Sequence, residues 1–248
     1  MEIVKSKIFE QFPEIIFGIS TKTGLNRPAP YYFNNSLTVG DNEKIVWENR
    51  EYFFGQLGLK REEMALQLQV HSDIITIVDT PGLKGESDAL ITNKKMVGLA
   101  ISTADCTPIF IYDNNKKVIA GVHSGWRGTT KKILEKALIL LSENFNSDPR
   151  DLYVYIGPCI SQANYEVGEE VACMFDKKYL LQVSDKKYLL DVKQANYDIL
   201  ISRNIPEEQI EMSPICSFEN KNLHSHRRDR ENSGRSLGVI AMKENNEI

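Results

Sequence analysis

Two segments in the middle of the chain place residue types that bind metals directly after apolar stretches. Cys106 stands in the segment STADC, and His123 stands in GVHSGWRG. A thiolate and an imidazole are good ligands for a borderline-soft ion such as zinc, and a catalytic zinc ion typically has three protein ligands and one open position. His71 is the natural third ligand, because it ends an alternating segment in a chain that has only 4 histidines. These residues therefore favour a metal site formed by His71, Cys106 and His123.

The same residues permit two other interpretations. Cys106 can act as a nucleophile with His123 as its base, as in cysteine hydrolases. A cysteine after a buried strand is also often an inert small apolar side chain, and a histidine often only makes hydrogen bonds. Because the three residues are far apart in the sequence, no spacing signature decides among a metal site, a nucleophile and ordinary packing.

Arginines in two segments suggest a site for an anion. In HSGWRGTT a glycine-flanked turn leads into a predicted helix, whose first N–H groups and dipole attract negative charge. Arg127 in this segment can bind phosphate through two parallel hydrogen bonds. A tight turn with Trp126 packed in the core explains that segment equally well. The second segment, HSHRRDRENSGR, contains four arginines, among them Arg228 and Arg235. It can be a phosphate or carboxylate clamp, a solvated loop, or a metal site through its His-x-His pair.

Two carboxylates and one aromatic segment add to the candidate site. Asp88 in SDALIT and Asp105 beside Cys106 can orient a ligand or move a proton, as carboxylates do around metal-bound histidines. Either can instead cap a turn. Asp105 is our candidate general base, because it adjoins a candidate ligand. The segment YEV at residues 165–167 can line a pocket, although ordinary packing accounts for it as well.

The elements that must position these residues are short strands interrupted by helices. Alternation and β-branched runs predict strands over Leu66–Val78, Val97–Ser102, Pro108–Tyr112, Val118–Val122 and Tyr153–Ile156. Helices are predicted over Glu43–Leu57 and over about Thr130–Phe145, where an apolar stripe follows a cap at Thr129 or Thr130. Several strands follow one another without a helix between them. This order favours an α+β fold with mixed sheets over a regular βαβ winding.

Length and composition are those of one domain with a substantial core. The chain has 248 residues, of which 42% are hydrophobic and 26% charged, and no repeat or linker divides it, so we expect a single domain over residues 1–248. A net charge of −4 indicates no surface for nucleic acid or an anionic membrane. No apolar stretch approaches the ~18 residues of a membrane span, and the first residues do not form a signal peptide. The 4 cysteines lack a C-x-x-C pair, which suggests reduced thiols and a cytoplasmic location.

An ordered set of motifs resembles the laccase-domain family, also called the peptidoglycan editing factor or multicopper polyphenol oxidase-like family. The motifs are GIST, VGDNEKIVWENR, QVH, DALIT, STADCTPIFIYD, GVHSGWRGT, YIGPCI with YEVG, and RRD with SGR. The resemblance implies an αββα-type sandwich similar to cysteine-hydrolase-like folds. It also implies zinc, with copper as an alternative, at His71, Cys106 and His123. The implied activity is purine nucleoside phosphorolysis, with adenosine deamination as a second activity and adenosine, inosine or methylthioadenosine plus inorganic phosphate as substrates.

Within that resemblance we expect Arg127, Arg228 and Arg235 to hold phosphate, with Asp88 on the substrate-binding side. Asp105 and Arg228 are the expected catalytic residues. The chain departs from the usual family pattern at three places, which bear on substrate preference more than on the metal site. The residues concerned are His224 in place of an aromatic residue, Ser233 in place of threonine, and Ala163 with Asn164 in place of paired cysteines.

Other functions remain open beside phosphorolysis. An amidase that hydrolyses a peptidoglycan precursor would use the same Cys/His site, and a non-catalytic partner protein would use only the fold. A multicopper oxidase needs a type 1 site and a histidine-rich trinuclear cluster, which 4 histidines cannot supply. The H-x-E and P-C-x-x-C signature of cytidine deaminases is absent.

Overall fold

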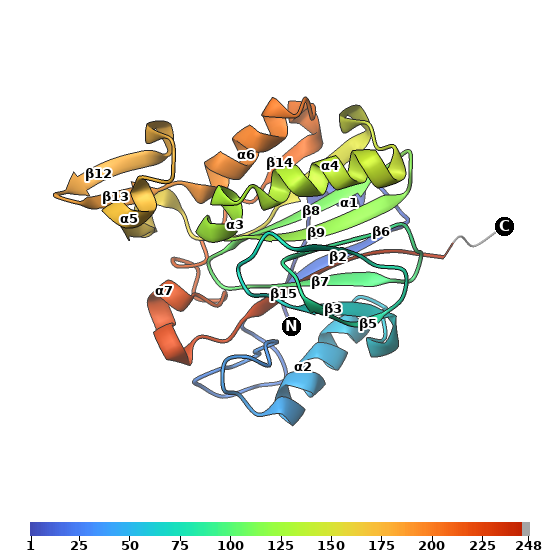
Figure 1. Ribbon diagram of the computed structural model, residues 1–248. Coiled ribbons are helices and arrows are strands. Elements are labelled where there is room, and N and C mark those ends of the chain that lie inside the picture. Colours follow the sequence, from blue (N-terminus) through green and yellow to red (C-terminus); the bar gives the residue numbers. More distant parts are fainter. Residues whose placement is uncertain (245–248) are drawn as a thin grey trace.

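Two six-stranded sheets form the centre of the molecule, as the computed structural model of residues 1–244 shows (Figure 1). The first sheet has the order β1-β2-β15-β7-β3-β5, with bounds Ile3–Val4, Ile15–Ser20, Ser236–Met242, Gly98–Thr103, Met64–Leu68 and Gly82–Glu86. The second has the order β14-β10-β8-β9-β6-β4, with bounds Ile210–Met212, Leu152–Ile156, Thr107–Asp113, Val118–Ser124, Ala89–Thr92 and Ile75–Ile77. Both sheets contain parallel and antiparallel pairs.

Helices cover the outer faces of the two sheets (Figure 1). On the second sheet lie α4 (Ile133–Phe145) and α6 (Val192–Ser202), whereas α2 (Glu43–Gln56) covers the first. The shorter α-helices are α1 (Lys7–Glu10), α3 (Trp126–Thr130), α5 (Glu169–Ala172) and α7 (His226–Asp229). Single 3₁₀ turns span Arg61–Glu63, Pro149–Asp151, Gln162–Asn164, Lys177–Tyr179, Glu207–Gln209 and Arg230–Asn232. The order of layers is helix, sheet, sheet, helix, which confirms the predicted α+β fold with mixed sheets and the αββα arrangement.

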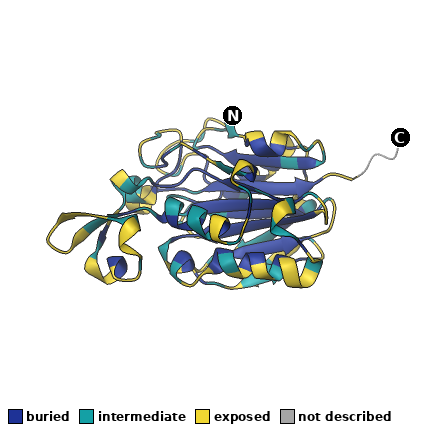
Figure 2. Ribbon diagram, turned by 90° about the horizontal axis from the view of Figure 1, so that it is seen from above, coloured by how far each residue is buried: buried dark blue, intermediate teal, exposed yellow. Residues whose placement is uncertain are grey.

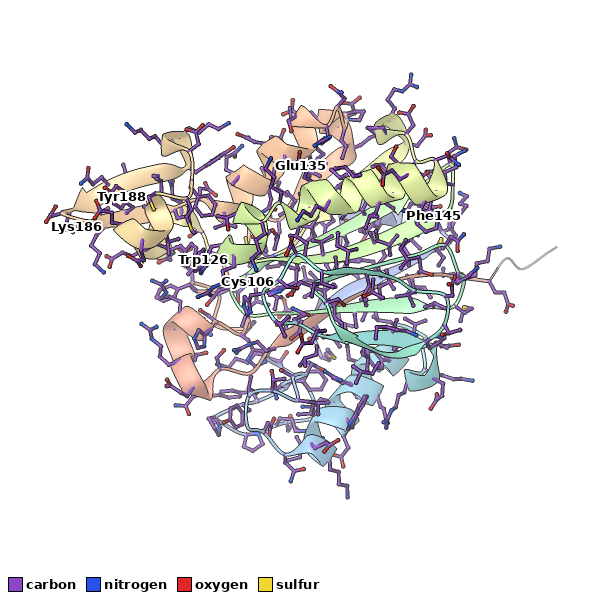
Figure 3. The ribbon with its side chains drawn as sticks, in the orientation of Figure 1. Cys106, Trp126, Glu135, Phe145, Lys186 and Tyr188 are labelled. Atoms are coloured by element: carbon purple, nitrogen blue, oxygen red, sulfur yellow. The ribbon has the colours of Figure 1, made fainter. Side chains whose placement is uncertain are left out.

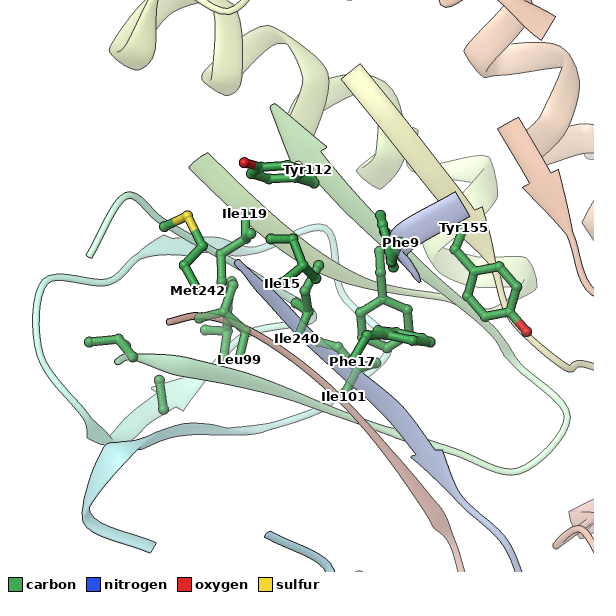
Figure 4. Packing of buried hydrophobic residues seen from close by; sticks show 14 of the residues in the cluster. Phe9, Ile15, Phe17, Leu99, Ile101, Tyr112, Ile119, Tyr155, Ile240 and Met242 are labelled. Atoms are coloured by element: carbon green, nitrogen blue, oxygen red, sulfur yellow. The ribbon is translucent and has the colours of Figure 1, made fainter. Parts of the chain in front are cut away.

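Side-chain alternation allows one strand to contribute side chains to two apolar cores, one on each face of its sheet. Successive residues of a strand point to opposite faces, so β7 sends Leu99 and Ile101 between the sheets and Ala100 towards α2. Between the sheets these side chains meet an aromatic group that includes Phe17 and Tyr155, whose ring centroids are 5.3 Å apart (Figure 4). Strands buried on both faces need nearly continuous apolar runs. For this reason the central strands were recognisable from the sequence.

A third, three-stranded sheet projects from the side of the sandwich and is called the arm below (Figure 2). Its order is β11-β13-β12, with bounds Glu166–Gly168, Lys187–Leu190 and Leu180–Ser184. The arm and α5 pack together through a small apolar cluster formed by Val167, Val171, Ala172, Leu190 and Val192. Trp126 and Tyr165 pack against this cluster from the sandwich side. The arm is thereby joined to the end of β9, which α3 follows.

Two predicted elements are each divided in the structure. The predicted strand Leu66–Val78 is two strands, β3 and β4, which belong to different sheets and are separated by a turn at His71. The predicted helix over Thr130–Phe145 is α3 followed by α4, with left-handed Lys132 (φ 62°) between them. The predicted threonine cap of α4 is wrong, because the hydroxyl of Thr130 donates back to the carbonyl of Arg127.

Two further observations concern the cysteines and the length of the helices. All four cysteines are free thiols. No helix in residues 1–244 combines the length and the apolar character that a membrane crossing requires.

Candidate metal centre

The three predicted metal ligands lie together at one end of the sandwich. His71 is in the turn from β3 to β4 and Cys106 in the turn from β7 to β8, and both turns pass from the first sheet to the second. His123, on β9, lies on the face that looks between the sheets, in alternation with Val122 on the α4 side. The ligand atoms of the three residues all lie within 4.8 Å of one another. The Nε2 atom of His71 is 3.9 Å from the Sγ atom of Cys106.

A buried carboxylate holds two of these ligands in place. Asp88 is fully buried, and its Oδ1 accepts a hydrogen bond of 2.8 Å from Nδ1 of His123. Such a bond fixes the imidazole tautomer and leaves Nε2 free for a metal. The same carboxylate accepts from the backbone N–H groups of His71 and Ser72 and from the Ser72 hydroxyl. Burial raises the pKa of Asp88, but the hydrogen bonds from His123 and Ser72 outweigh it and set the pKa at about 2.

The surroundings of Cys106 favour its thiolate form. Burial raises the pKa of the Cys106 thiol, whereas the positive charge of His123 and hydrogen bonds from both imidazoles lower it below the usual range. A thiolate is the form of cysteine that binds metals. The donor set of one thiolate and two imidazoles therefore fits a transition metal with a fourth position open to substrate.

The backbone adopts the left-handed conformation on both ligand-bearing turns. His71 has φ 57° and Asp105 has φ 86°, a conformation that costs a non-glycine residue of order 1–3 kcal/mol and is found most often at functional sites. The hydrogen bonds to Asp88 stabilise the turn at His71. Asp105 is held by bonds of 2.6 Å from the Ser217 hydroxyl and from the Arg227 backbone N–H. Both of its carboxylate oxygens are thus engaged by the C-terminal segment, and its role as general base stays a prediction.

Gly125 leaves the space that Cys106 occupies. A Cβ atom at position 125 would lie 2.7 Å from Sγ of Cys106 and 3.5 Å from Cδ2 of His71. We expect Gly125→Ala to displace the thiol and to lower zinc affinity about 10-fold or more, comparable to the loss of an outer-shell contact. Competition for zinc with a chromophoric chelator measures this. Gly55→Ala in α2 is the control, because its Cβ meets nothing within 4 Å. Equal zinc affinity in the two variants would contradict the packing argument.

The three arginines that the sequence suggested for phosphate differ in their environments. Arg228 has a partner for every donor: it pairs with Asp229, and the carbonyls of Ser217, Phe218, Asn220 and Leu223 accept its remaining N–H groups. Within residues 1–244 the side chain of Arg235 donates only through Nη1, to the carbonyls of Ser233 and Gly234. The Arg127 guanidinium lies 4.2 Å from the ring centroid of Trp126. Arg127 and Arg235 therefore keep hydrogen-bond donors for an anion. All the side-chain donors of Arg228 are used in hydrogen bonds within its own C-terminal segment.

Several other sequence interpretations are answered by placement. Asp88, which we expected on the substrate-binding side, is fully buried behind His123 and exposes no surface to a substrate, and its carboxylate contacts His123 instead. His224 is buried and His226 exposed, and neither belongs to the one ligand cluster found in residues 1–244. Trp126 is half-buried and packs against the arm cluster, which is compatible with a tight turn in HSGWRGTT, and the anion site in that segment stays a prediction. Sequence reasoning missed Gly125, because only the folded chain brings it against Cys106.

An αββα sandwich with a His-Cys-His cluster at the end of its paired sheets defines an α+β protein with a candidate transition-metal centre. The chain belongs to the family described as multi-copper polyphenol oxidoreductase laccase, whose model matches residues 16–243.

Curated relatives and solved structures are similar to most of the chain. The purine nucleoside phosphorylase YlmD of Bacillus subtilis is 34% identical over 253 residues, which cover 93% of this chain and 90% of the relative. A purine nucleoside phosphorylase of Clostridium acetobutylicum is 37% identical over 177 residues, 71% of this chain and 75% of the relative. The crystal structure of YlmD from Geobacillus stearothermophilus superposes with a TM-score of 0.89 at 29% identity and covers 96% of this chain and 94% of that one. The hypothetical protein YfiH of Bacillus licheniformis gives a TM-score of 0.91 at 28% identity, covering 97% and 96%.

Proposed function

We propose that the protein is a zinc-dependent purine nucleoside phosphorylase, which converts a purine nucleoside and inorganic phosphate to the free base and ribose 1-phosphate. The observation that carries the proposal is the cluster of His71, Cys106 and His123, with donor atoms within 4.8 Å of one another. Relatives that carry the name purine nucleoside phosphorylase support the reaction class. Arg127 and Arg235, which have no carboxylate partner among residues 1–244, supply positive charge for phosphate.

The reaction is a displacement at the anomeric carbon of the ribose. A phosphate oxygen forms a bond to C1′ while the bond from C1′ to the purine nitrogen breaks, and the base leaves with that electron pair and takes up a proton. Arg127 and Arg235 would bind and orient the phosphate. Zinc, when bound by the three ligands, supplies a Lewis acid that polarises an oxygen or lowers the pKa of a water. The same capability would support adenosine deamination as a second activity.

Zinc is proposed over copper on the chemistry of the donors. One thiolate and two imidazoles are a normal ligand set for zinc with an open fourth position. Copper binds the same ligand types, and the family description refers to copper. The two remaining histidines, His224 and His226, lie outside the cluster, and two imidazoles are too few for the histidine-rich trinuclear cluster of a multicopper oxidase. Metal analysis of the purified protein, expected to give one zinc per chain, tests this choice.

The reaction is tested by incubating the zinc-loaded protein with adenosine, with and without inorganic phosphate, and separating the products by chromatography. We expect adenine to form only when phosphate is present, because phosphate is a substrate. Inosine would report the deaminase activity. A zinc-loaded protein that releases neither adenine nor inosine, with inosine and methylthioadenosine also unreactive, would overturn the proposal.

An amidase acting on a peptidoglycan precursor is the second candidate. It is favoured by one observation: Sγ of Cys106 lies within 4.8 Å of a ring nitrogen of His123, which in turn bonds to Asp88 at 2.8 Å, and this is the order of a nucleophile, its base and an orienting acid. Such an enzyme would need neither zinc nor phosphate. Activity on a muropeptide precursor that survives chelation of the metal would therefore favour the amidase.

A further inference from the structure

Arg227, a neighbour of the saturated Arg228, lies at the metal centre and keeps most of its hydrogen-bonding capacity. Its backbone N–H donates to Asp105, the residue before the ligand Cys106, at 2.6 Å. In the part of the chain that the structure describes, its side chain makes one hydrogen bond, from Nη1 to the carbonyl of Glu166 at 2.8 Å. Arg227 makes no ion pair with a carboxylate in residues 1–244. Its Nε and Nη2 groups, together with one proton on Nη1, remain free to bind another group.

Tyr165 sets the position of this guanidinium. The guanidinium carbon of Arg227 lies 5.1 Å from the centroid of the Tyr165 ring, which is a cation–π contact. The ring packs against the apolar cluster beneath the arm, and the carbonyl that anchors Nη1 belongs to Glu166, the first residue of β11. The ring and the arm strand together hold the plane of the guanidinium, and a fixed plane is what two parallel hydrogen bonds to an oxyanion require.

A second arginine also lies over an aromatic ring that packs against this cluster. Arg127 lies over Trp126, which packs against the same apolar cluster as Tyr165 (Figure 3 labels Trp126 beside Cys106). Burial raises the pKa of the Tyr165 phenol, as does the negative charge of Cys106, whereas the positive charges of Arg227 and Arg127 lower it. Both guanidinium groups, the Cys106 thiolate and the Asp105 carboxylate thus act on one phenol. Neither arginine side chain forms an ion pair with a carboxylate in residues 1–244, so both keep hydrogen-bond donors and positive charge for an anion.

We propose that Arg227, held by Tyr165, contacts the phosphate substrate, and that the arm serves to position this arginine and Arg127 at the mouth of the metal centre. The inference rests on the proposed phosphorylase function and replaces Arg228 by Arg227 in phosphate binding. Arg227 is a substrate-binding residue, and Tyr165 is a positioning residue that acts through it.

The test separates binding of phosphate from binding of nucleoside. We expect Arg227→Gln to raise the KM for phosphate about 10-fold or more, because a charge-assisted contact is lost, with little change in the KM for nucleoside. Tyr165→Leu, which removes the ring, should raise the KM for phosphate about 5-fold, and Tyr165→Phe should restore it. A purely structural role would change thermal stability without this selective effect. Arg230→Gln is the matched control, because Arg230 is an exposed arginine of the same segment.

A calorimetric titration of the zinc-loaded proteins with inorganic phosphate requires no turnover. Weaker phosphate binding by Arg227→Gln than by Arg230→Gln supports the inference even if no nucleoside is cleaved, in which case only the proposed function fails. Equal phosphate affinity of the two variants, or no phosphate binding by the wild-type protein, overturns it. Phosphate-dependent turnover with an unchanged KM for phosphate in Arg227→Gln would leave the phosphorylase function standing and overturn the role of Arg227.

Discussion

Cys106→Ala is expected to give a folded protein that no longer holds zinc stoichiometrically and has lost phosphorolysis and deamination together. Cys106 supplies the only thiolate of the three-ligand cluster. Loss of an outer-shell partner of a metal ligand already costs about 10- to 100-fold in affinity or activity, so loss of the ligand itself should cost more than ~100-fold. Metal content by mass spectrometry and product formation from adenosine measure the two effects.

The matched control for this substitution is Cys173→Ala. Cys173 is exposed and lies outside the ligand cluster, so its loss should change neither zinc content nor rate. Circular dichroism and thermal unfolding of both variants verify that they fold. A folded Cys106→Ala protein that still carries out phosphorolysis at the wild-type rate would show that this reaction does not use the His-Cys-His site.

Asp88→Ala is expected to reduce both stability and metal affinity. The carboxylate is fully buried and accepts hydrogen bonds from His123, from Ser72 and from the backbone of the His71 turn. Its removal leaves buried donors without partners, which should lower the free energy of unfolding by about 3 kcal/mol or more. Released from this contact, His123 should bind zinc about 10- to 100-fold less tightly. Chemical denaturation and chelator competition measure the two losses.

The same residue predicts how stability depends on acid. The pKa of Asp88 is about 2 in the folded protein, below the value of about 4 for an unfolded aspartate. Its contribution to stability is therefore present in full above pH 4 and is lost as the pH falls towards 2. The apoprotein should lose stability in this range, and the Asp88→Ala variant should lose less. Asp79→Asn is the control, since Asp79 is an exposed partner of Lys94. Equal acid sensitivity in wild-type protein and the Asp88 variant would contradict the assignment.

The sequence predicted strands and helices whose apolar pattern is uniform, and it missed those whose pattern is interrupted. Strands β7, β8, β9 and β10 were recognised, but β15, which pairs with β7 in the first sheet, and β2, which pairs with β15, were not. Each missed strand carries a glycine, Gly18 or Gly238, which lowers strand propensity, although the recognised strand β9 also carries one, Gly121. The structure shows the reason at Gly238, where a Cβ atom would lie 2.4 Å from the ring of Phe110 in the facing sheet. Close approach of two sheets explains the glycine, and no local pattern reports it.

For the site, the types of the residues were more informative than their positions in the sequence. The types of His71, Cys106 and His123 indicated a metal cluster, which the fold then assembled across the two sheets. The roles of the arginines could not be predicted from residue type. Arg227 and Arg228 are adjacent and identical in type, yet one faces Tyr165 with free donors and the other is saturated by carbonyls and Asp229. That difference follows from the path of residues 217–223, which is a tertiary property.

Because both ligand-bearing turns pass from one sheet to the other, a bound metal ion would affect the stability of the fold as well as catalysis. An ion bound by His71, Cys106 and His123 would cross-link the two halves of the sandwich, and the unfolded chain would have no matching site. Binding to the folded form alone stabilises it by about 2.7 kcal/mol when free zinc is 100-fold above its Kd. The melting temperature would then rise and fall with zinc supply, and the lifetime of the protein under proteolysis would follow the availability of the metal.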